Sequence, residues 1–126
     1  MRYLLDTNAL YGSVFDTQFL SRRAREVIEE KRYLGVSIVS IWEIAIKQSI
    51  GKLQLSVPAE YLFDICAGLE IDIENIGKAD IETVRNLPLH HRDPFDRMIV
   101  AQAMNRGCTI VTSDQTIPQY DVATIW

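Results

Sequence analysis

The sequence has 126 residues, the length of one domain, with 48% hydrophobic and 24% charged residues. This composition excludes a disordered or low-complexity chain, and no apolar stretch approaches the ~18 residues of a membrane span. Thirteen basic and seventeen acidic side chains give a net charge of −4, which taken alone argues against a protein that coats nucleic acid, but four acids in one metal site would leave thirteen of each sign, so net charge decides little.

The first half of the chain alternates between strand and helix patterns. In chain order it predicts a strand over 2–5, a helix over 8–15, an amphipathic helix over 18–32 and a strand over 34–39. Ser40 and Glu43 then have the S-x-x-E spacing of a capping box, which predicts a helix that starts there and stops at Gly51.

The second half continues this alternation. It predicts a helix from Pro58 to about Gly68, an edge strand over 70–76, helices over 78–87 and 94–106, a buried strand over 108–112 and a last strand over 122–125. Asp93 followed by Pro94 is typical of an N-cap with proline in the first turn, and Gly107 ends that helix. The pattern indicates one α/β domain over 1–126, with a parallel sheet and helices on both faces.

The start of the chain and its two cysteines predict a cytoplasmic protein. The apolar run after Met1 ends at Asp6, so it does not resemble a secretory signal. Cys66 and Cys108 lie in apolar surroundings without metal-ligand spacing, so we interpret them as buried hydrophobic residues rather than a disulfide or reactive thiols.

Four acids follow the predicted strands or begin the predicted helices. Asp6 and Asp114 follow strands, whereas Glu43 and Asp96 are expected in the first turns of their helices. In open parallel sheets the functional groups lie at the carboxyl ends of the strands. Helices that pack back on the sheet bring their first turns to the same edge, so we expect these four carboxylates to converge.

Each acid also has an ordinary structural explanation. Asp6 and Asp114 suit turns after strands, Glu43 suits a capping box, Asp93 suits an N-cap, and Asp96 suits the helix dipole. Carboxylates gathered without basic partners repel one another, however, and a divalent cation relieves that repulsion. Carboxylate ligands suit Mg²⁺ or Mn²⁺, and no Cys/His cluster has zinc spacing, so the combination predicts a metal site for phosphodiester chemistry.

Short segments in a fixed order carry a family resemblance. They are Leu5-Asp6-Thr7-Asn8, SIWEIAIK over 40–47, GKLQL over 51–55, HRDPFDR over 91–97, Thr112-Ser113-Asp114 and YDVATIW over 120–126. Together they resemble the PIN domain family, and more narrowly the VapC-type toxins of bacterial toxin–antitoxin pairs. The resemblance implies a three-layer sandwich, in which helices flank a central, mostly parallel sheet of four to five strands.

The resemblance also implies a ribonuclease that depends on one or two Mg²⁺ or Mn²⁺ ions. The family's four acids, which both bind metal and act in catalysis, carry over onto Asp6, Glu43, Asp96 and Asp114. Thr7 and Thr112 match supporting hydroxyl positions, and Asp93 is an optional fifth acid. Further implications are an RNA substrate, a homodimer and a small cognate antitoxin.

Other side chains are candidates for contacts with RNA. Lys47 lies one helical turn after Glu43, and Arg92 and Arg97 flank the acids at 93 and 96, so these three basic residues are candidate substrate contacts. The basic groups over 22–25 and 31–32 are weaker candidates, for which a solvated helix face is the alternative.

Two histidines and two aromatic residues receive structural interpretations. We interpret His90 and His91 as solvent-facing rather than catalytic, and Trp42 and Phe95 as core residues rather than platforms for bases.

Three alternative functions stay open from the sequence. A housekeeping RNA-processing PIN nuclease would carry the same acids, and an inactive PIN module would only bind protein or RNA. A signalling receiver domain shares the length, the α/β alternation and the acids at strand ends. It needs an adjacent acidic pair after its first strand, however, whereas Asp6 is followed by Thr7 and Asn8.

Overall fold

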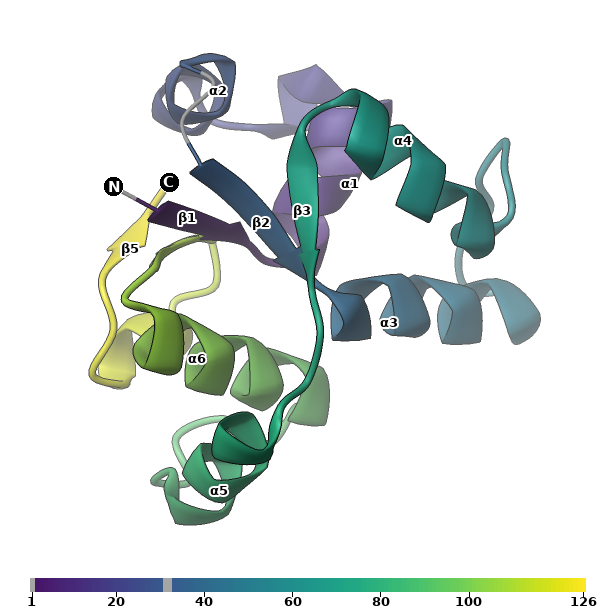
Figure 1. Cartoon of the computed structure of the whole chain (residues 1–126). Helices are drawn as coiled ribbons and strands as arrows, with labels where there is room; N and C mark the ends of the chain where they lie inside the picture. Colours follow the sequence, from purple (N-terminus) through teal and green to yellow (C-terminus); the bar gives the residue numbers. More distant parts are fainter. Residues whose placement is uncertain (1, 31–32) are drawn as a thin grey trace.

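A computed structural model of the chain describes residues 2–30 and 33–126. One parallel sheet runs through its centre, in the order β3-β2-β1-β4-β5 (Figure 1). Its strands are β1 (Arg2–Leu5), β2 (Tyr33–Ser37), β3 (Ile71–Glu74), β4 (Thr109–Val111) and β5 (Thr124–Ile125). The α/β class and the parallel sheet are therefore confirmed. The order differs from the 2-1-3-4-5 order of receiver-type folds, so the receiver alternative is wrong.

Helices cover both faces of the sheet and make three layers. Within the described residues they are α1 (Thr7–Phe15), α2 (Arg22–Glu29), α3 (Ile38–Ser49), α4 (Leu62–Gly68), α5 (Lys78–Asn86) and α6 (Pro94–Arg106), with 3-10 turns η1 (Thr17–Phe19), η2 (Ala59–Tyr61) and η3 (Ile117–Gln119). Helices α1, α2 and α4 lie on one side of the sheet, whereas α6 lies on the other with α5 beyond it (Figure 1). None of these helices has the length and apolar character that spanning a membrane requires.

The central strand β1 shows how the sheet divides the core into two halves. Alternate side chains of a strand point to opposite faces. Tyr3 and Leu5 accordingly join the cluster under α1, α2 and α4, while Leu4 joins the cluster under α6 that contains Ile99 and Ile110. Leu4 and Leu5 are fully buried. Because burial of each contributes about 1.5–3 kcal/mol, both faces fix β1 and the acid at its end.

The two cysteines occupy these two core clusters. Cys66 lies in the first cluster and Cys108 in the second, and both are buried free thiols. Burial raises the pKa of Cys66 to about 11 and also raises the pKa of Cys108. The interpretation as buried hydrophobic residues is confirmed.

The helix that carries Glu43 begins earlier than the capping-box spacing predicts. Helix α3 starts at Ile38, and its N-cap is Ser37, whose Oγ accepts a hydrogen bond from the Val39 N–H at 3.1 Å. Ser40 lies inside the helix and Glu43 lies in its second turn. The capping-box interpretation is therefore wrong. The predicted extension of the strand to residue 39 is wrong too, because the apolar run over 34–39 is divided between β2, which ends at Ser37, and the buried first turn of α3.

The amphipathic helix predicted over 18–32 is also too long. Residues 17–19 form η1, Ser21 caps α2 through a bond to Ala24, and α2 ends at Glu29. Figure 1 shows α2 beside the amino-terminal ends of the strands, away from the acids at the carboxyl ends. The basic side chains over 22–25 therefore lie far from the predicted site, and those over 31–32 lie outside the described residues.

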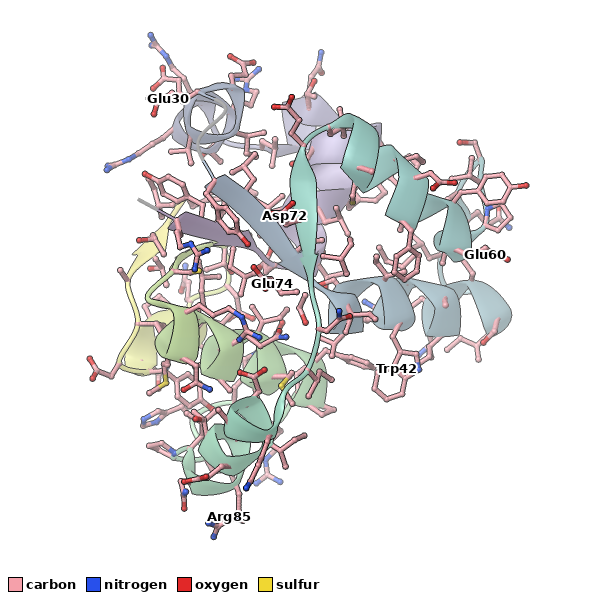
Figure 2. All side chains as sticks on the ribbon, in the orientation of Figure 1. Glu30, Trp42, Glu60, Asp72, Glu74 and Arg85 are labelled. Atoms are coloured by element: carbon pink, nitrogen blue, oxygen red, sulfur yellow. The ribbon has the colours of Figure 1, made fainter. Side chains whose placement is uncertain are left out.

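Trp42 does not belong to the core. Its side chain is 59% exposed and projects from α3 away from the sheet (Figure 2). Its ring contacts half-buried Phe95 edge-on, with 5.3 Å between the centroids. The core interpretation of Trp42 is wrong because Phe95 covers only part of its ring. Phe95 itself packs, half-buried, against the second core cluster.

A buried ion pair joins α5 to α6. Asp80 is 2% exposed, and its two oxygens accept hydrogen bonds from the Arg106 guanidinium at 2.8 and 3.0 Å. Asn105 and the Gly77 N–H donate to the same carboxylate. Burial by itself raises the pKa of Asp80, but these bonds outweigh it and lower that pKa to about 2.

We expect Asp80→Ala to reduce the free energy of unfolding by about 3–5 kcal/mol near neutral pH, because Arg106 loses its two short bonds to Asp80 and keeps only the longer carboxylate contact with Glu74, at 3.3 Å. Since the pKa of Asp80 lies below its unfolded value, this stability is present above about pH 4 and is lost as the pH falls toward about 2. Urea unfolding at the two ends of this window measures the difference. Exposed Asp64→Ala is the control, within about 0.5 kcal/mol of wild type, and an equal loss in both variants would contradict the assignment.

Candidate active site

The carboxyl ends of β1 and β4 bring two of the predicted acids together. Asp6 follows β1, and its N–H donates to the carbonyl of Val111 at the end of β4, at 3.1 Å. The Asp6 side chain is 4% exposed and caps α1 by accepting a hydrogen bond from the Ala9 N–H at 2.8 Å. Asp114 lies three residues beyond β4, where its Oδ1 accepts from the Thr116 N–H at 2.7 Å.

Thr112 connects these two acids. Its Oγ1 accepts a hydrogen bond from the Asp114 N–H at 3.0 Å, and its hydroxyl bonds to the Asp6 carboxylate. Thr112 is itself buried. The supporting position that the family resemblance implies is therefore occupied by a hydroxyl that touches both neighbours.

Glu43 approaches the site from α3 and is held through both of its oxygens. Oε1 accepts a hydrogen bond from Thr7 Oγ1 at 2.7 Å, and Oε2 lies 2.8 Å from the Lys47 ammonium. The same Thr7 oxygen lies 3.0 Å from Ser40 Oγ. Because Thr7 directly follows Asp6 in the chain, these contacts fix Glu43 beside the end of β1.

The first turn of α6 supplies the remaining acid. Asp93 is the N-cap, and its Oδ1 accepts hydrogen bonds from the N–H groups of Phe95 at 2.8 Å and Asp96 at 3.1 Å. The predicted cap is confirmed. The Asp96 side chain does not cap the helix, and it interacts electrostatically with Asp6 and Asp114 at the edge where β1 and β4 end.

Electrostatic interactions link the four acids into one cluster. Burial, and then the charges of Asp114 and Glu43, raise the pKa of Asp6 to about 6. Burial, and then the charges of Asp93, Asp6 and Asp114, raise the pKa of Asp96 to about 7. Burial opposes the ionisation of Asp114 too, but bonds from Thr116 and His91 outweigh it and lower its pKa. The cluster therefore carries more negative charge than its neighbours balance.

His91 lies between two of these acids. Its Nε2 is 3.0 Å from Oδ2 of Asp96 and 3.0 Å from Oδ2 of Asp114. Its Nδ1 accepts a hydrogen bond from the Asp93 N–H at 3.2 Å, which places a ring proton on Nε2, where both carboxylates share it. The solvent-facing interpretation is wrong for His91, although the His90 side chain is exposed.

Arg97 holds the loop that carries His91. Its guanidinium donates to the carbonyls of Pro88 at 2.9 Å and His91 at 3.4 Å, and to the Tyr120 hydroxyl at 3.1 Å. It also reaches the carbonyls of Val84 and Leu87. These bonds explain Arg97 as a loop anchor, so its assignment as a candidate substrate contact has a structural alternative. Arg92 is exposed on the same loop, and its contact with substrate stays a prediction.

The donor set fits a hard divalent cation. The donor atoms of His91, Asp96 and Asp114 all lie within 4.8 Å of one another, and Asp6 interacts electrostatically with both acids. Carboxylate oxygens are ligands that Mg²⁺ and Mn²⁺ prefer. A cation at this position would also offset the burial and the repulsion that together raise the pKa of Asp6 and Asp96.

Comparisons with known proteins agree with this geometry. The family model described as PIN domain matches residues 3–123. The chain is 29% identical over 120 residues to "Ribonuclease VapC22" of Mycobacterium tuberculosis. The aligned region covers 90% of this chain and 88% of that protein.

Solved structures share the fold at low identity. A chain of VapBC2 from Rickettsia felis, bound to a promoter DNA fragment, superposes with a TM-score of 0.74 at 14% identity, covering 99% of this chain and 98% of that one. A chain of a toxin–antitoxin complex from Klebsiella pneumoniae gives 0.65 at 16%, covering 98% and 96%.

The raised pKa values predict that the metal-free protein is less stable at higher pH. Asp6 and Asp96 bind protons more tightly in the folded chain than in the unfolded one, so the free energy of unfolding falls as the pH rises from about 4 through about 7. We expect Asp96→Asn to be more stable than wild type by about 1–3 kcal/mol at about pH 8 in a chelator, with little difference near pH 4. Urea unfolding measures both, and a less stable variant at the higher pH would contradict the electrostatic account.

The position of His91 predicts competition with the cation. We expect His91→Ala to bind Mn²⁺ about threefold to tenfold more tightly in calorimetric titration, because Asp96 and Asp114 no longer share a hydrogen bond that the ion must replace. His90→Ala, which removes an exposed ring packed on Tyr120, is the matched control. Weaker binding by His91→Ala would show instead that the imidazole is a ligand.

Proposed function

The chain belongs to the PIN domain family, and from that premise we propose that it is a metal-dependent ribonuclease, the toxin of a toxin–antitoxin pair. The observation that carries the proposal is the convergence of Asp6, Glu43, Asp96 and Asp114 at one edge of the sheet. The ribonuclease name of the mycobacterial relative and the toxin–antitoxin neighbour support it.

We propose that Asp6, Asp96 and Asp114 hold Mg²⁺ or Mn²⁺ directly, as one ion or two. Both oxygens of Glu43 are engaged, by Thr7 and Lys47. We therefore propose that Glu43 adds negative charge beside the ion from α3, and that it becomes a direct ligand only if one of these contacts is released. A divalent ion bound there would lower the pKa of a water molecule and stabilise negative charge on the phosphate oxygens. The chain's own contribution is to fix the carboxylates before the substrate arrives, which Thr7 and Thr112 do through their hydroxyls.

The proposed substrate is RNA, cleaved by attack of water on the phosphorus. Hydrolysis of this kind leaves 5′-phosphate and 3′-hydroxyl ends and does not use the 2′-hydroxyl. The net charge of −4 does not oppose this substrate, because the thirteen acids outside the four-carboxylate cluster equal the thirteen basic residues in number. Whether RNA binds therefore depends on the bound cation and the basic side chains near the acids rather than on the overall charge of the protein.

We further propose a cognate antitoxin and a homodimer as the protein partners. An apolar cavity of about 230 Å³ lies between α3 and the start of α4, and Trp42 and Phe63 are exposed beside it. Exposed aromatic side chains around an apolar hollow are typical of protein interfaces. We assign this side of the molecule to a second copy of the chain.

We expect Asp6→Asn to lower Mn²⁺-dependent cleavage of RNA at least about 100-fold, because one anionic ligand is lost. Asparagine keeps the oxygen that caps α1, so the fold should survive. Cleavage of end-labelled total RNA, with and without a chelator, measures the effect, and ligation of the products tests for 5′-phosphates. Asp64→Asn, an exposed acid of α4, is the matched control. Equal cleavage by wild type and Asp6→Asn would reject the proposal.

A further inference from the structure

We propose that the cavity beside Glu43 is a subsite for one nucleotide that flanks the cleaved phosphodiester, with lysines for its phosphate and an aromatic corner for its base. The inference rests on the proposed ribonuclease function and adds where the RNA lies. The cavity has a volume of about 420 Å³, within the usual range for small-molecule sites. The lining residues that matter are Thr7, Tyr11, Phe19, Lys47, Lys52 and Leu53.

The cavity borders the acid cluster through two side chains that contact Glu43. Thr7 and Lys47 line it, and both of them also contact Glu43, at 2.7 and 2.8 Å. A molecule that occupies the cavity is therefore separated from the cluster by single side chains. Along an RNA strand, that places the occupant next to the phosphodiester that water would hydrolyse at the acid cluster.

One wall of the cavity is basic, and the chain turn after α3 builds it. Gly51 has a φ of +74°, a left-handed conformation that glycine adopts without strain. The turn folds the chain back, so that the N–H groups of Lys52 and Leu53 donate to the Lys47 carbonyl at 2.9 and 3.2 Å. Two lysines thus stand together at the end of α3. Lys52 is exposed, and none of the carboxylates in the described part of the chain lies within 4 Å of its ammonium, so it is available to a phosphate.

A second wall is an aromatic corner. The rings of Tyr11 and Phe19 stand at 89° with 6.2 Å between their centroids, so the edge of one meets the face of the other. Phe19 is 44% exposed, and Ile44 adds a buried apolar side chain to the lining. Bases of any identity stack on aromatic faces. The corner therefore suits a planar base more than an extended aliphatic side chain.

Charge favours RNA over a protein segment as the occupant. Lys47 already pairs with Glu43, but an apolar peptide would remove the Lys52 ammonium from water without offering it a partner, whereas a nucleotide supplies a phosphate and a base together. The cavity and the cluster also complement each other, since the acids would hold the metal at one phosphate and the lysines would neutralise the next.

Binding of RNA by the cleavage-deficient Asp96→Asn variant tests the subsite. The probe is a short, fluorescein-labelled, single-stranded RNA pool of random sequence in Mg²⁺, and the readout is fluorescence anisotropy at several salt concentrations. In this background we expect Lys52→Gln to weaken binding about threefold to tenfold and to reduce the slope of log affinity against log salt by about 0.7. Tyr11→Leu should weaken binding about fivefold or more with the salt slope retained. Phe19→Leu replaces it if Tyr11→Leu does not fold.

Matched controls change the same residue types elsewhere. Lys78→Gln on α5 and Tyr61→Leu in η2 do not line the cavity and should bind RNA within about twofold of the parent. Parental affinity in the cavity variants would overturn the subsite, and so would equal weakening in the controls. If the cavity variants bound RNA as the parent does but no longer bound the cognate antitoxin, the cavity would be assigned to a protein segment instead. If wild type cleaves RNA, such results reject only the subsite; if it cleaves none, the proposed function fails with it.

Discussion

Mutual repulsion of carboxylates at one edge of a parallel sheet is the constraint on which the rest of the structure depends. Burial and neighbouring negative charge raise the pKa of Asp6 to about 6 and that of Asp96 to about 7, so the fold holds these groups where isolated acids would not remain. The two core clusters on either face of β1 supply the stability that makes this possible. Lys47 and His91 are the partners that moderate the charge, one at Glu43 and one between Asp96 and Asp114. A cluster of partly buried carboxylates of this kind favours binding of a divalent cation, because the positive charge offsets their repulsion.

The scaffold positions the cluster through short-range contacts at element ends. Asp6 caps α1, Asp93 caps α6, and Thr112 ties the end of β4 to the end of β1. Arg97 and Tyr120 hold the loop before α6, which fixes where His91 points. On the other side, the turn at Gly51 brings Lys52 back beside Lys47. The acid cluster and the basic wall of the cavity therefore meet at α3, because Glu43 and Lys47 lie on the same face of that helix. This juxtaposition is the physical basis for placing metal chemistry and RNA contact next to each other.

Sequence patterns predicted the acids at the strand ends because buried strands leave an apolar run that stops abruptly at Asp6 and shortly before Asp114. Asp93-Pro94 likewise has a local cause, since a cap and a proline act within one turn. Four features escaped prediction because they depend on distant partners. The start of α3 at Ile38 depends on burial of both the strand and the helix, and the exposure of Trp42 depends on how much of its ring Phe95 covers. The His91 bridge requires β4 and α6 to meet, and the Asp80–Arg106 pair requires α5 to pack on α6. Nothing in the local sequence distinguishes His91, Asp80 and Arg106 from charged residues on the surface.

Anomalous diffraction from a crystal grown with Mn²⁺ tests the central claim most directly, because it locates the ion independently of any activity. The account predicts a strong anomalous peak in contact with carboxylate oxygens of Asp6, Asp96 and Asp114, with the imidazole of His91 no longer between the last two. An absence of anomalous density at this edge under saturating Mn²⁺, or an ion bound only at unrelated surface acids, would contradict it.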